Sequence, residues 1–168
     1  TELLLQANRR DLDPAILHPS LSFKELNCVS ENDLDFNTQV FAHSRFHQDP
    51  RISSKQADEL WNQYLKNFKV SSNQKAFCAT QAEEKLGLIL TQLNFETSEA
   101  CLFYVAVKPN SRGLGIGSFL INNTLKVLSD FNCFTEVYCR NLKALNFYLG
   151  NGLNMIKSTQ SVLHRWAK

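Results

Sequence analysis

Three glycines at alternate positions, Gly113, Gly115 and Gly117, lie between an apolar run and the start of an amphipathic segment. Glycine has no side chain, so backbone N–H groups beside it can approach a ligand closely. The unpaired N–H groups at the start of a helix also favour negative charge. This loop therefore predicts a phosphate group held by main-chain amides, with Arg112 adding a positive charge.

The spacing of these glycines excludes two common phosphate-binding motifs. A nucleotide P-loop needs a lysine after its last glycine, whereas Ser118 follows Gly117 here. A dinucleotide-binding fold needs Gly-x-Gly-x-x-Gly, whereas this loop reads Gly-x-Gly-x-Gly. Glu136 stands about 20 residues further on, where that fold has its ribose-binding acid, but it falls inside an expected strand. For the loop taken alone, a tight surface turn remains the simpler alternative.

A second motif follows the loop along the chain. It reads Asn-x-x-Ala-x-x-Phe-Tyr-x-x-x-Gly and consists of Asn141, Ala144, Phe147, Tyr148 and Gly152. Together with the Arg-x-x-Gly-x-Gly loop before it, this motif resembles the acetyl-CoA site of the GNAT acetyltransferase superfamily. The resemblance implies an enzyme that transfers an acetyl group from acetyl-CoA to an amine.

The resemblance also implies a role for each element of the site. The loop amides would hold the CoA pyrophosphate, and the strand before them would bond the pantetheine arm and face the thioester oxygen. Tyr148 would be the general acid that protonates the CoA sulfur, with packing against Phe147 as the simpler alternative. The residues expected at the acetyl-CoA site are Val105, Ala106, Val107, Arg112, Gly113, Leu114, Gly115, Ile116, Gly117, Ser118, Asn141, Ala144 and Phe147. Acetyl-CoA is the expected co-substrate, and no metal is expected.

Two further stretches bear on the acceptor amine. "AHSRFHQDPRISSKQADELWNQYL" and "VLHRW" resemble the TDP-fucosamine acetyltransferases, which acetylate the 4-amino group of a TDP-linked 4-amino-4,6-dideoxygalactose. The resemblance implies an acceptor site made by Arg45, Phe46, His47, Arg51 and His164, with the arginines on the diphosphate. Alternatively, Asp49 only shapes a loop and Arg51 is solvated. A peptide or protein amine as acceptor, and a non-catalytic acyl-CoA-binding module, also stay open.

No general base is predicted. The candidates are His43, His47, Asp49, Glu136 and His164. Each of them is more often an ordinary polar residue, and ordered water can also carry the proton away.

Composition narrows the class of protein. The 18 basic and 16 acidic side chains nearly balance, at a net charge of +2, which argues against nucleic acid as a partner. The five cysteines show no C-x-x-C spacing, which argues against a zinc site or a secreted disulfide framework and favours a cytoplasmic protein. The longest apolar run, "CLFYVAV", is far shorter than the roughly 18 residues of a membrane span. We expect a small-molecule amine as partner, and a homodimer.

The elements that must position these motifs follow from the hydrophobic periodicity. Residues 1–20 show no period and predict an N-terminal arm, or the remnant of an upstream segment, before one domain over residues 21–168. Strands are expected over residues 21–28, 75–81, 85–95, 100–107 and 133–139, and as a final pair within 153–166. Helices are expected from residue 32, over 53–68, where Ser53 and Gln56 form a capping box, over 116–128, and over 141–150. The fold class expected from this order and the resemblance is mixed α/β, a GNAT fold whose mostly antiparallel sheet has about seven strands flanked by about four helices.

Overall fold

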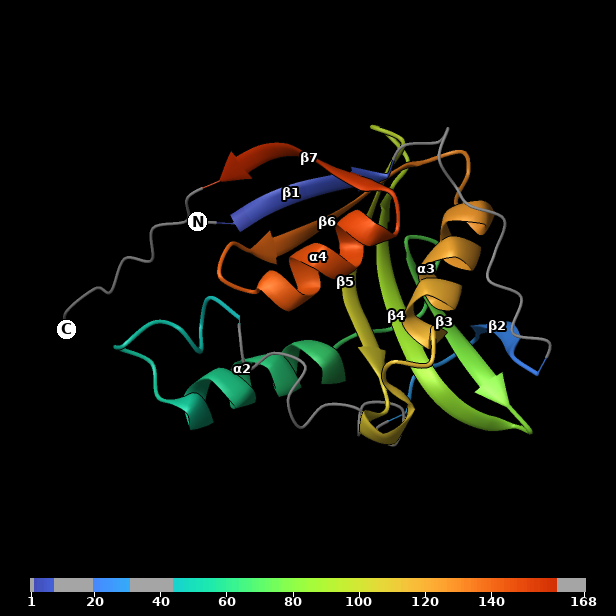
Figure 1. The fold of residues 1–168 in the computed structure, drawn as a ribbon, viewed down its shortest axis with the longest axis horizontal. Coiled ribbons are helices and arrows are strands. Elements are labelled where there is room, and N and C mark those ends of the chain that lie inside the picture. Colours follow the sequence, from blue (N-terminus) through green and yellow to red (C-terminus); the bar gives the residue numbers. More distant parts are fainter. Residues whose placement is uncertain (1, 8–19, 31–43, 160–168) are drawn as a thin grey trace.

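The computed structural model describes residues 2–7, 20–30 and 44–159 of the chain. These residues form one mixed α/β fold in which helices cover both faces of a sheet (Figure 1). None of the helices in these ranges is long and apolar enough to cross a membrane.

The sheet has seven strands in the order β2-β3-β4-β5-β6-β1-β7. Their bounds are Glu2–Ala7 (β1), Ser22–Leu26 (β2), Gln74–Gln81 (β3), Glu84–Asn94 (β4), Glu99–Val107 (β5), Asn132–Tyr138 (β6) and Leu153–Thr159 (β7). All neighbours are antiparallel except β5 and β6. The expected fold class, with its mostly antiparallel sheet and the meander β3-β4-β5, is therefore confirmed.

The expectation of an N-terminal arm is wrong for residues 2–7. They form β1, which pairs with β6 on one side and β7 on the other. Leu5 in this strand is fully buried. The run of three leucines in "TELLLQA" is too short to show any period, so the sequence pattern did not indicate this strand. Only one strand of the expected final pair, β7, lies within the described residues.

Three α-helices are described, together with the short 3-10 helix η2 (Pro109–Ser111). Their bounds are Ser54–Lys66 (α2), Ile116–Val127 (α3) and Leu142–Gly150 (α4). The predicted capping box at the start of α2 is present, since Ser53 accepts from the Gln56 backbone and the Gln56 side chain accepts from Ser53 N–H. The helix expected from residue 32 falls mostly outside the described residues, and residues 44–47 at its expected end form a turn.

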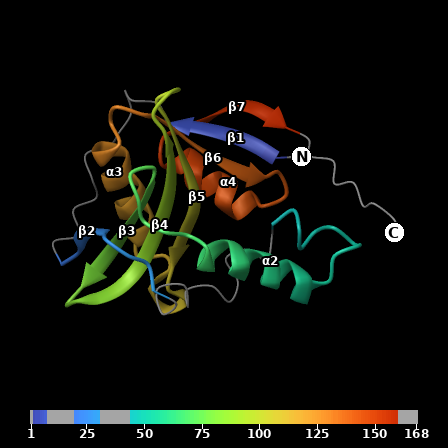
Figure 2. The ribbon, with the colours of Figure 1, turned by 180° about the vertical axis from the view of Figure 1, so that it is seen from behind.

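Two hydrophobic layers hold the helices on opposite faces of the sheet. Figures 1 and 2, seen from opposite sides, show α3 and α4 on one face and α2 on the other. Phe77, Ile89 and Leu120 belong to the core beneath α3, whereas Leu65 and Leu88 belong to the core beneath α2. This division follows from the alternation of side chains along β3 and β4.

The two halves of the sheet meet only briefly at its centre. Strands β5 and β6 share the pairs Glu99↔Asn132, Ala100↔Cys133 and Cys101↔Phe134, and the described residues beyond these pairs do not pair across the two strands. From there β5 runs toward η2 while β6 turns away alongside β1, so the sheet opens as a V (Figure 1). This divergence interrupts the sheet at the point where parallel pairing would otherwise continue.

Candidate active site

The V between β5 and β6 is shaped by a bulge and closed at its apex by one side chain. Register passes from Leu90↔Tyr104 to Thr91↔Leu102, so Phe103 is an extra residue in β5. Such a bulge bends its strand, which directs β5 away from β6. At the apex, the Thr135 hydroxyl donates a hydrogen bond of 2.7 Å to Leu102 O.

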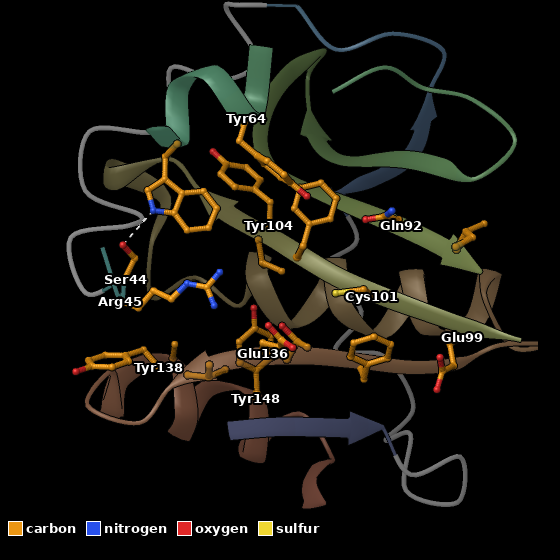
Figure 3. A pocket seen from close by; sticks show the side chains of 18 of the residues that line it. Ser44, Arg45, Tyr64, Gln92, Glu99, Cys101, Tyr104, Glu136, Tyr138 and Tyr148 are labelled. Atoms are coloured by element: carbon orange, nitrogen blue, oxygen red, sulfur yellow. Dashed lines mark hydrogen bonds between the residues drawn. The ribbon is translucent and has the colours of Figure 1, made fainter. Parts of the chain in front are cut away.

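A cavity of about 1090 Å³ opens beside the V, between α2, the turn at residues 44–46 and the strands β4, β5 and β6 (Figure 3). Its aromatic lining is Phe46, Trp61, Tyr64, Phe95, Phe103, Tyr104, Phe134, Tyr138 and Tyr148. Its ionisable lining includes three carboxylates, Glu96, Glu99 and Glu136, and one guanidinium, that of Arg45. The cavity therefore combines aromatic surface with an excess of negative charge.

Tyr148 reaches this cavity from the other face of the sheet. It lies on α4 and packs within the core beneath α3, with 8% of its surface exposed, yet it also lines the cavity. The gap between β5 and β6 allows this α4 side chain to pack in the core on one face of the sheet and to line the cavity on the other. Burial raises the pKa of Tyr148 to about 12, and a hydrogen-bonding contact with the Thr135 side chain acts against this rise. The phenol is therefore protonated throughout the physiological pH range.

Cys101 and Glu136 lie close to Tyr148 at this gap. Burial, reinforced by the negative charge of Glu136, raises the pKa of the Cys101 thiol to about 12. The Cys101 thiol in turn contributes to the raised pKa of Tyr148. Cys101 is thus a neutral thiol at physiological pH, and its chemistry there is that of a small apolar group rather than a nucleophile.

The three loop positions require glycine for two different structural reasons. Gly113 has a φ of +81° and Gly115, the N-cap of α3, has a φ of +78°, so both occupy the left-handed region that favours glycine. Gly117 is different, because a Cβ there would stand 2.9 Å from Phe147 Cζ. At Gly113, a Cβ would find nothing within 4 Å, so the backbone there is open to a ligand as expected.

The other residues expected at the acetyl-CoA site lie around the open end of the V. Arg112 Nε donates to Val107 O at 3.1 Å, which holds the loop against the end of β5. Asn141 Oδ1 caps α4 by accepting from Ala144 N–H at 3.2 Å, and Asn141, Ala144 and Val105 all line the cavity. No side chain caps the α3 N-terminus, so among the described residues its N–H groups keep their capacity for an anion. This arrangement fits a diphosphate.

Some of these residues have packing roles instead. Ile116 and Ala106 are each 3% exposed and belong to the two cores. Phe147 packs against Gly117 and Tyr148. Leu114, in contrast, is exposed, and Ser118 is half-buried in the first turn of α3. Because the side chains of Ile116 and Ala106 are buried, only their backbone groups are left for the contacts expected of the loop and the strand.

The residues expected at the acceptor site are only partly brought together. Arg45 and Phe46 line the cavity. His47 is not among the lining residues, and its ring nitrogens contact Ser44 and Asp58. Arg51 is exposed and makes a two-point ion pair with Asp49, which lowers the pKa of Asp49 to about 2. His43 and His164 lie outside the described residues.

Several cavity residues escaped the sequence analysis. Trp61 and Tyr64 repeat at the helical spacing of an apolar face of α2, which favours a core position, but they are partly exposed and line the cavity. Phe103 faces it because of the bulge, and Thr135 because β5 and β6 part. No periodicity signals a bulge or the end of a strand ladder, so only the alternation that places Phe134, Glu136 and Tyr138 on one face was available.

Comparisons with solved structures support the fold. An aminoglycoside acetyltransferase from an uncultured soil metagenomic sample, solved with trehalose, has a TM-score of 0.52 and 20% identity, covering 90% of this chain and 97% of that one. An acetyltransferase from Thermus thermophilus has a TM-score of 0.56 and 21% identity, covering 82% of this chain and 89% of that one. A spermidine N-acetyltransferase chimera from Vibrio cholerae SpeG and hSSAT has a TM-score of 0.51 and 19% identity, covering 79% of both chains.

Sequence comparison gives the family directly. No curated protein sequence is significantly similar to this chain. A family model described as acetyltransferase (GNAT) family, however, matches residues 39–152, which is more than half of the chain and includes the glycine loop, β5, β6 and Tyr148. The chain therefore belongs to the acetyltransferase (GNAT) family and is an acyl-CoA-dependent N-acetyltransferase.

Proposed function

We propose that this protein transfers the acetyl group of acetyl-CoA to the amine of a small, positively charged acceptor, with Tyr148 as general acid. The observation that carries the proposal is the position of Tyr148, which passes through the gap between β5 and β6 into the wall of the cavity. Bound acetyl-CoA supplies an activated acyl group in the form of a thioester. The remaining steps belong to residues of the chain.

The open end of the V supplies the proposed binding groups for the co-substrate. The N-terminus of α3, with the bare backbone at Gly113 and Gly115, offers N–H groups to the pyrophosphate. Arg112 adds a positive charge beside them. Beyond Leu102, whose carbonyl accepts from Thr135, the edge of β5 that faces β6 is not paired with it, so the backbone groups there are available to an extended arm.

Tyr148 supplies the proton in this proposal. Its phenol stays protonated because burial raises its pKa to about 12, so it is ready to donate when charge develops on a departing sulfur. A phenol of such high pKa does not give up its proton to a weakly basic group. Donation therefore accompanies the departure of the thiolate rather than preceding it.

The charge of the cavity supports a cationic acceptor. Three carboxylates line it, and Glu136 lies close enough to Cys101 to raise the pKa of that thiol. An ammonium ion is stabilised by carboxylates and also by the faces of aromatic rings. We propose that Glu136 binds the acceptor ammonium. Glu136 then takes the proton that the ammonium must lose before its nitrogen attacks the thioester.

A TDP-linked aminosugar is the second candidate acceptor. Arg45 favours it, because its guanidinium lies 5.0 Å from the centre of the Phe46 ring within the cavity, a pairing that suits a phosphate and a planar base. Arg51, in contrast, is committed to Asp49 outside the cavity lining. A free aminosugar would use only the carboxylates and aromatic rings of the cavity, whereas a nucleotide-linked aminosugar would also use Arg45. The two acceptors are therefore tested separately.

The test is a panel of acceptors offered with acetyl-CoA while free thiol is measured. It comprises spermidine, glucosamine, TDP-4-amino-4,6-dideoxygalactose, a lysine-containing tripeptide and no acceptor. We expect thiol release above the no-acceptor rate with spermidine or glucosamine. Release with the TDP sugar alone supports the second candidate, and release with the tripeptide alone contradicts both. Calorimetric binding of CoA without turnover of any amine would contradict the enzymatic proposal.

A further inference from the structure

The turn at residues 44–47 is attached to α2 at two points. Trp61 Nε1 donates to Ser44 Oγ at 3.0 Å, and His47 Nε2 lies 2.9 Å from Asp58 Oδ1. Asp58 and Trp61 are three residues apart on α2, so they share one side of the helix. Ser44 and His47 are also three residues apart, and the turn therefore lies lengthwise along α2.

Arg45 and Phe46, the two residues between these attachments, line the cavity, as does Ser44. Phe46 meets Trp61 edge-on, with ring centres 5.8 Å apart, and the Arg45 guanidinium lies over Phe46. Figure 3 shows the Arg45 side chain reaching from the turn toward the middle of the cavity. The positions of Arg45 and Phe46 in the cavity lining therefore depend on the hydrogen bonds of Ser44 and His47, which flank them in the turn.

The chemistry of the partners fixes the direction of these bonds. An indole N–H can only donate, and a carboxylate can only accept. Neutral His47 must therefore carry its proton on Nε2, toward Asp58, which leaves Nδ1 to accept from the Ser44 hydroxyl at 2.9 Å. Ser44 Oγ accepts from Trp61 Nε1 and, at 3.4 Å, from His47 N–H. The chain of bonds Trp61–Ser44–His47–Asp58 is then complete.

We propose that His47 and Asp58 are positioning residues for the acceptor, and that they act through Arg45 and Phe46. Neither His47 nor Asp58 lines the cavity. The His47 side chain is 8% exposed, whereas that of Asp58 is 66% exposed, so Asp58 is a surface anchor for a buried ring. The proposal rests on the proposed function, because it concerns the acceptor side of the same site.

The first test compares Asp58→Ala, Asp58→Asn and His47→Ala as full-length proteins, with the panel amine that wild type acetylates fastest. Asp58→Ala and His47→Ala are expected to raise the KM for that amine about tenfold, the loss of roughly one hydrogen bond to a charged group, with the KM for acetyl-CoA and kcat nearly unchanged. Asp58→Asn keeps an acceptor oxygen for His47 and should restore most of the affinity. Glu59→Ala removes the neighbouring charge on α2 and serves as the matched control.

A double-mutant cycle decides whether the effect passes through the turn. In an Arg45→Ala/Phe46→Ala background, His47→Ala should raise the KM for the amine no further, because the residues that it positions are gone. An equal effect in both backgrounds would overturn the proposal. So would a parallel loss of acetyl-CoA affinity, or an Asp58→Ala variant that behaves like Glu59→Ala.

An independent readout needs no acceptor. Nitrogen-15 NMR of the wild-type histidines should show His47 with a proton on Nε2 and none on Nδ1 at a pH where the ring is neutral. The opposite tautomer would contradict the bond directions and the proposal with them. This measurement distinguishes the bond directions at His47 from the proposed function. If no panel amine were acetylated, the proposed function would be wrong, but the tautomer of His47 would be unaffected.

Discussion

Thr135 Oγ1 donates to Leu102 O at 2.7 Å, at the point where the pairing of β5 with β6 has just ended. This bond gives the Leu102 carbonyl a side-chain partner on β6, just beyond the last backbone pair of the two strands. Thr135→Val keeps the shape of the side chain and removes the donor. We expect the free energy of unfolding to fall by about 1–3 kcal/mol, because a buried carbonyl is left without a hydrogen bond.

Urea denaturation of the purified variants measures this change. Thr135→Ser is the matched control, since it retains the hydroxyl and should lose much less stability than Thr135→Val. Equal stability of Thr135→Val and wild type would show that water satisfies Leu102 O and that the apex does not depend on this side chain.

Tyr148→Phe tests the general acid. Loss of the hydroxyl should lower kcat about 100-fold, at the lower end of the usual range for a general acid, while the KM for acetyl-CoA changes little. Steady-state kinetics with saturating amine gives both values. An unchanged kcat, in an enzyme whose single-turnover rate shows that acetyl transfer is rate-limiting, would remove Tyr148 from the mechanism.

Gly117→Ala tests the packing between the two motifs. The new Cβ would stand 2.9 Å from Phe147 Cζ, so the ring must move, and we expect a loss of about 1–3 kcal/mol in the free energy of unfolding. Phe147→Leu, introduced together with Gly117→Ala, should recover part of that loss by making room. Thermal denaturation of the two single variants and the double variant reveals the coupling, and strictly additive losses would exclude it.

The raised pKa of Tyr148 predicts how stability varies at high pH. The phenol has an ordinary pKa of 10.0, and burial raises the pKa of Tyr148 to about 12 in the folded protein. Folding therefore favours the neutral form, and this contribution is complete below pH 10 and is lost as pH rises toward 12. Wild type should lose on the order of 2 kcal/mol more than Tyr148→Phe between these values. Parallel unfolding curves for both proteins across this range would contradict the prediction.

The raised pKa of Cys101 predicts its reactivity. At pH 8 a thiol with a pKa of about 12 has almost no thiolate, which is the form that reacts with iodoacetamide. Cys28 is exposed, so we expect it to be alkylated first while Cys101 persists in the folded protein. Peptide mass spectrometry at timed intervals measures the order, and early modification of Cys101 would mean that the V opens to reagent and solvent.

Local signals predicted most of the fold. The capping box of Ser53 and Gln56, the apolar face of α2 and the alternation along β3 and β4 each act over a few residues, so the sequence shows them directly. Residues 2–7 were missed because their place in the sheet is set by β6 and β7, which lie at the other end of the chain.

The candidate site was predictable on its co-substrate side and less so on its acceptor side. The loop and the α4 motif are each short stretches of the sequence, and their resemblance to the GNAT acetyl-CoA site pointed to Gly113, Asn141 and Tyr148. The acceptor cavity, in contrast, depends on the bulge at Phe103 and on the early end of the β5–β6 ladder. Both are properties of pairing between strands, which no local pattern in the sequence shows. His47, expected at the acceptor site, is not among the cavity-lining residues and bonds Asp58.

The place of β1 between β6 and β7 has a consequence for biosynthesis. Its partners are the last strands of the described chain to leave the ribosome, so β1 must wait for them while the meander β3-β4-β5 can already assemble. Until then its leucines lack the strands that pair with β1 in the folded protein. The half of the sheet that holds Glu136 is thus completed last, and a nascent chain without β7 lacks one of the two neighbours of β1.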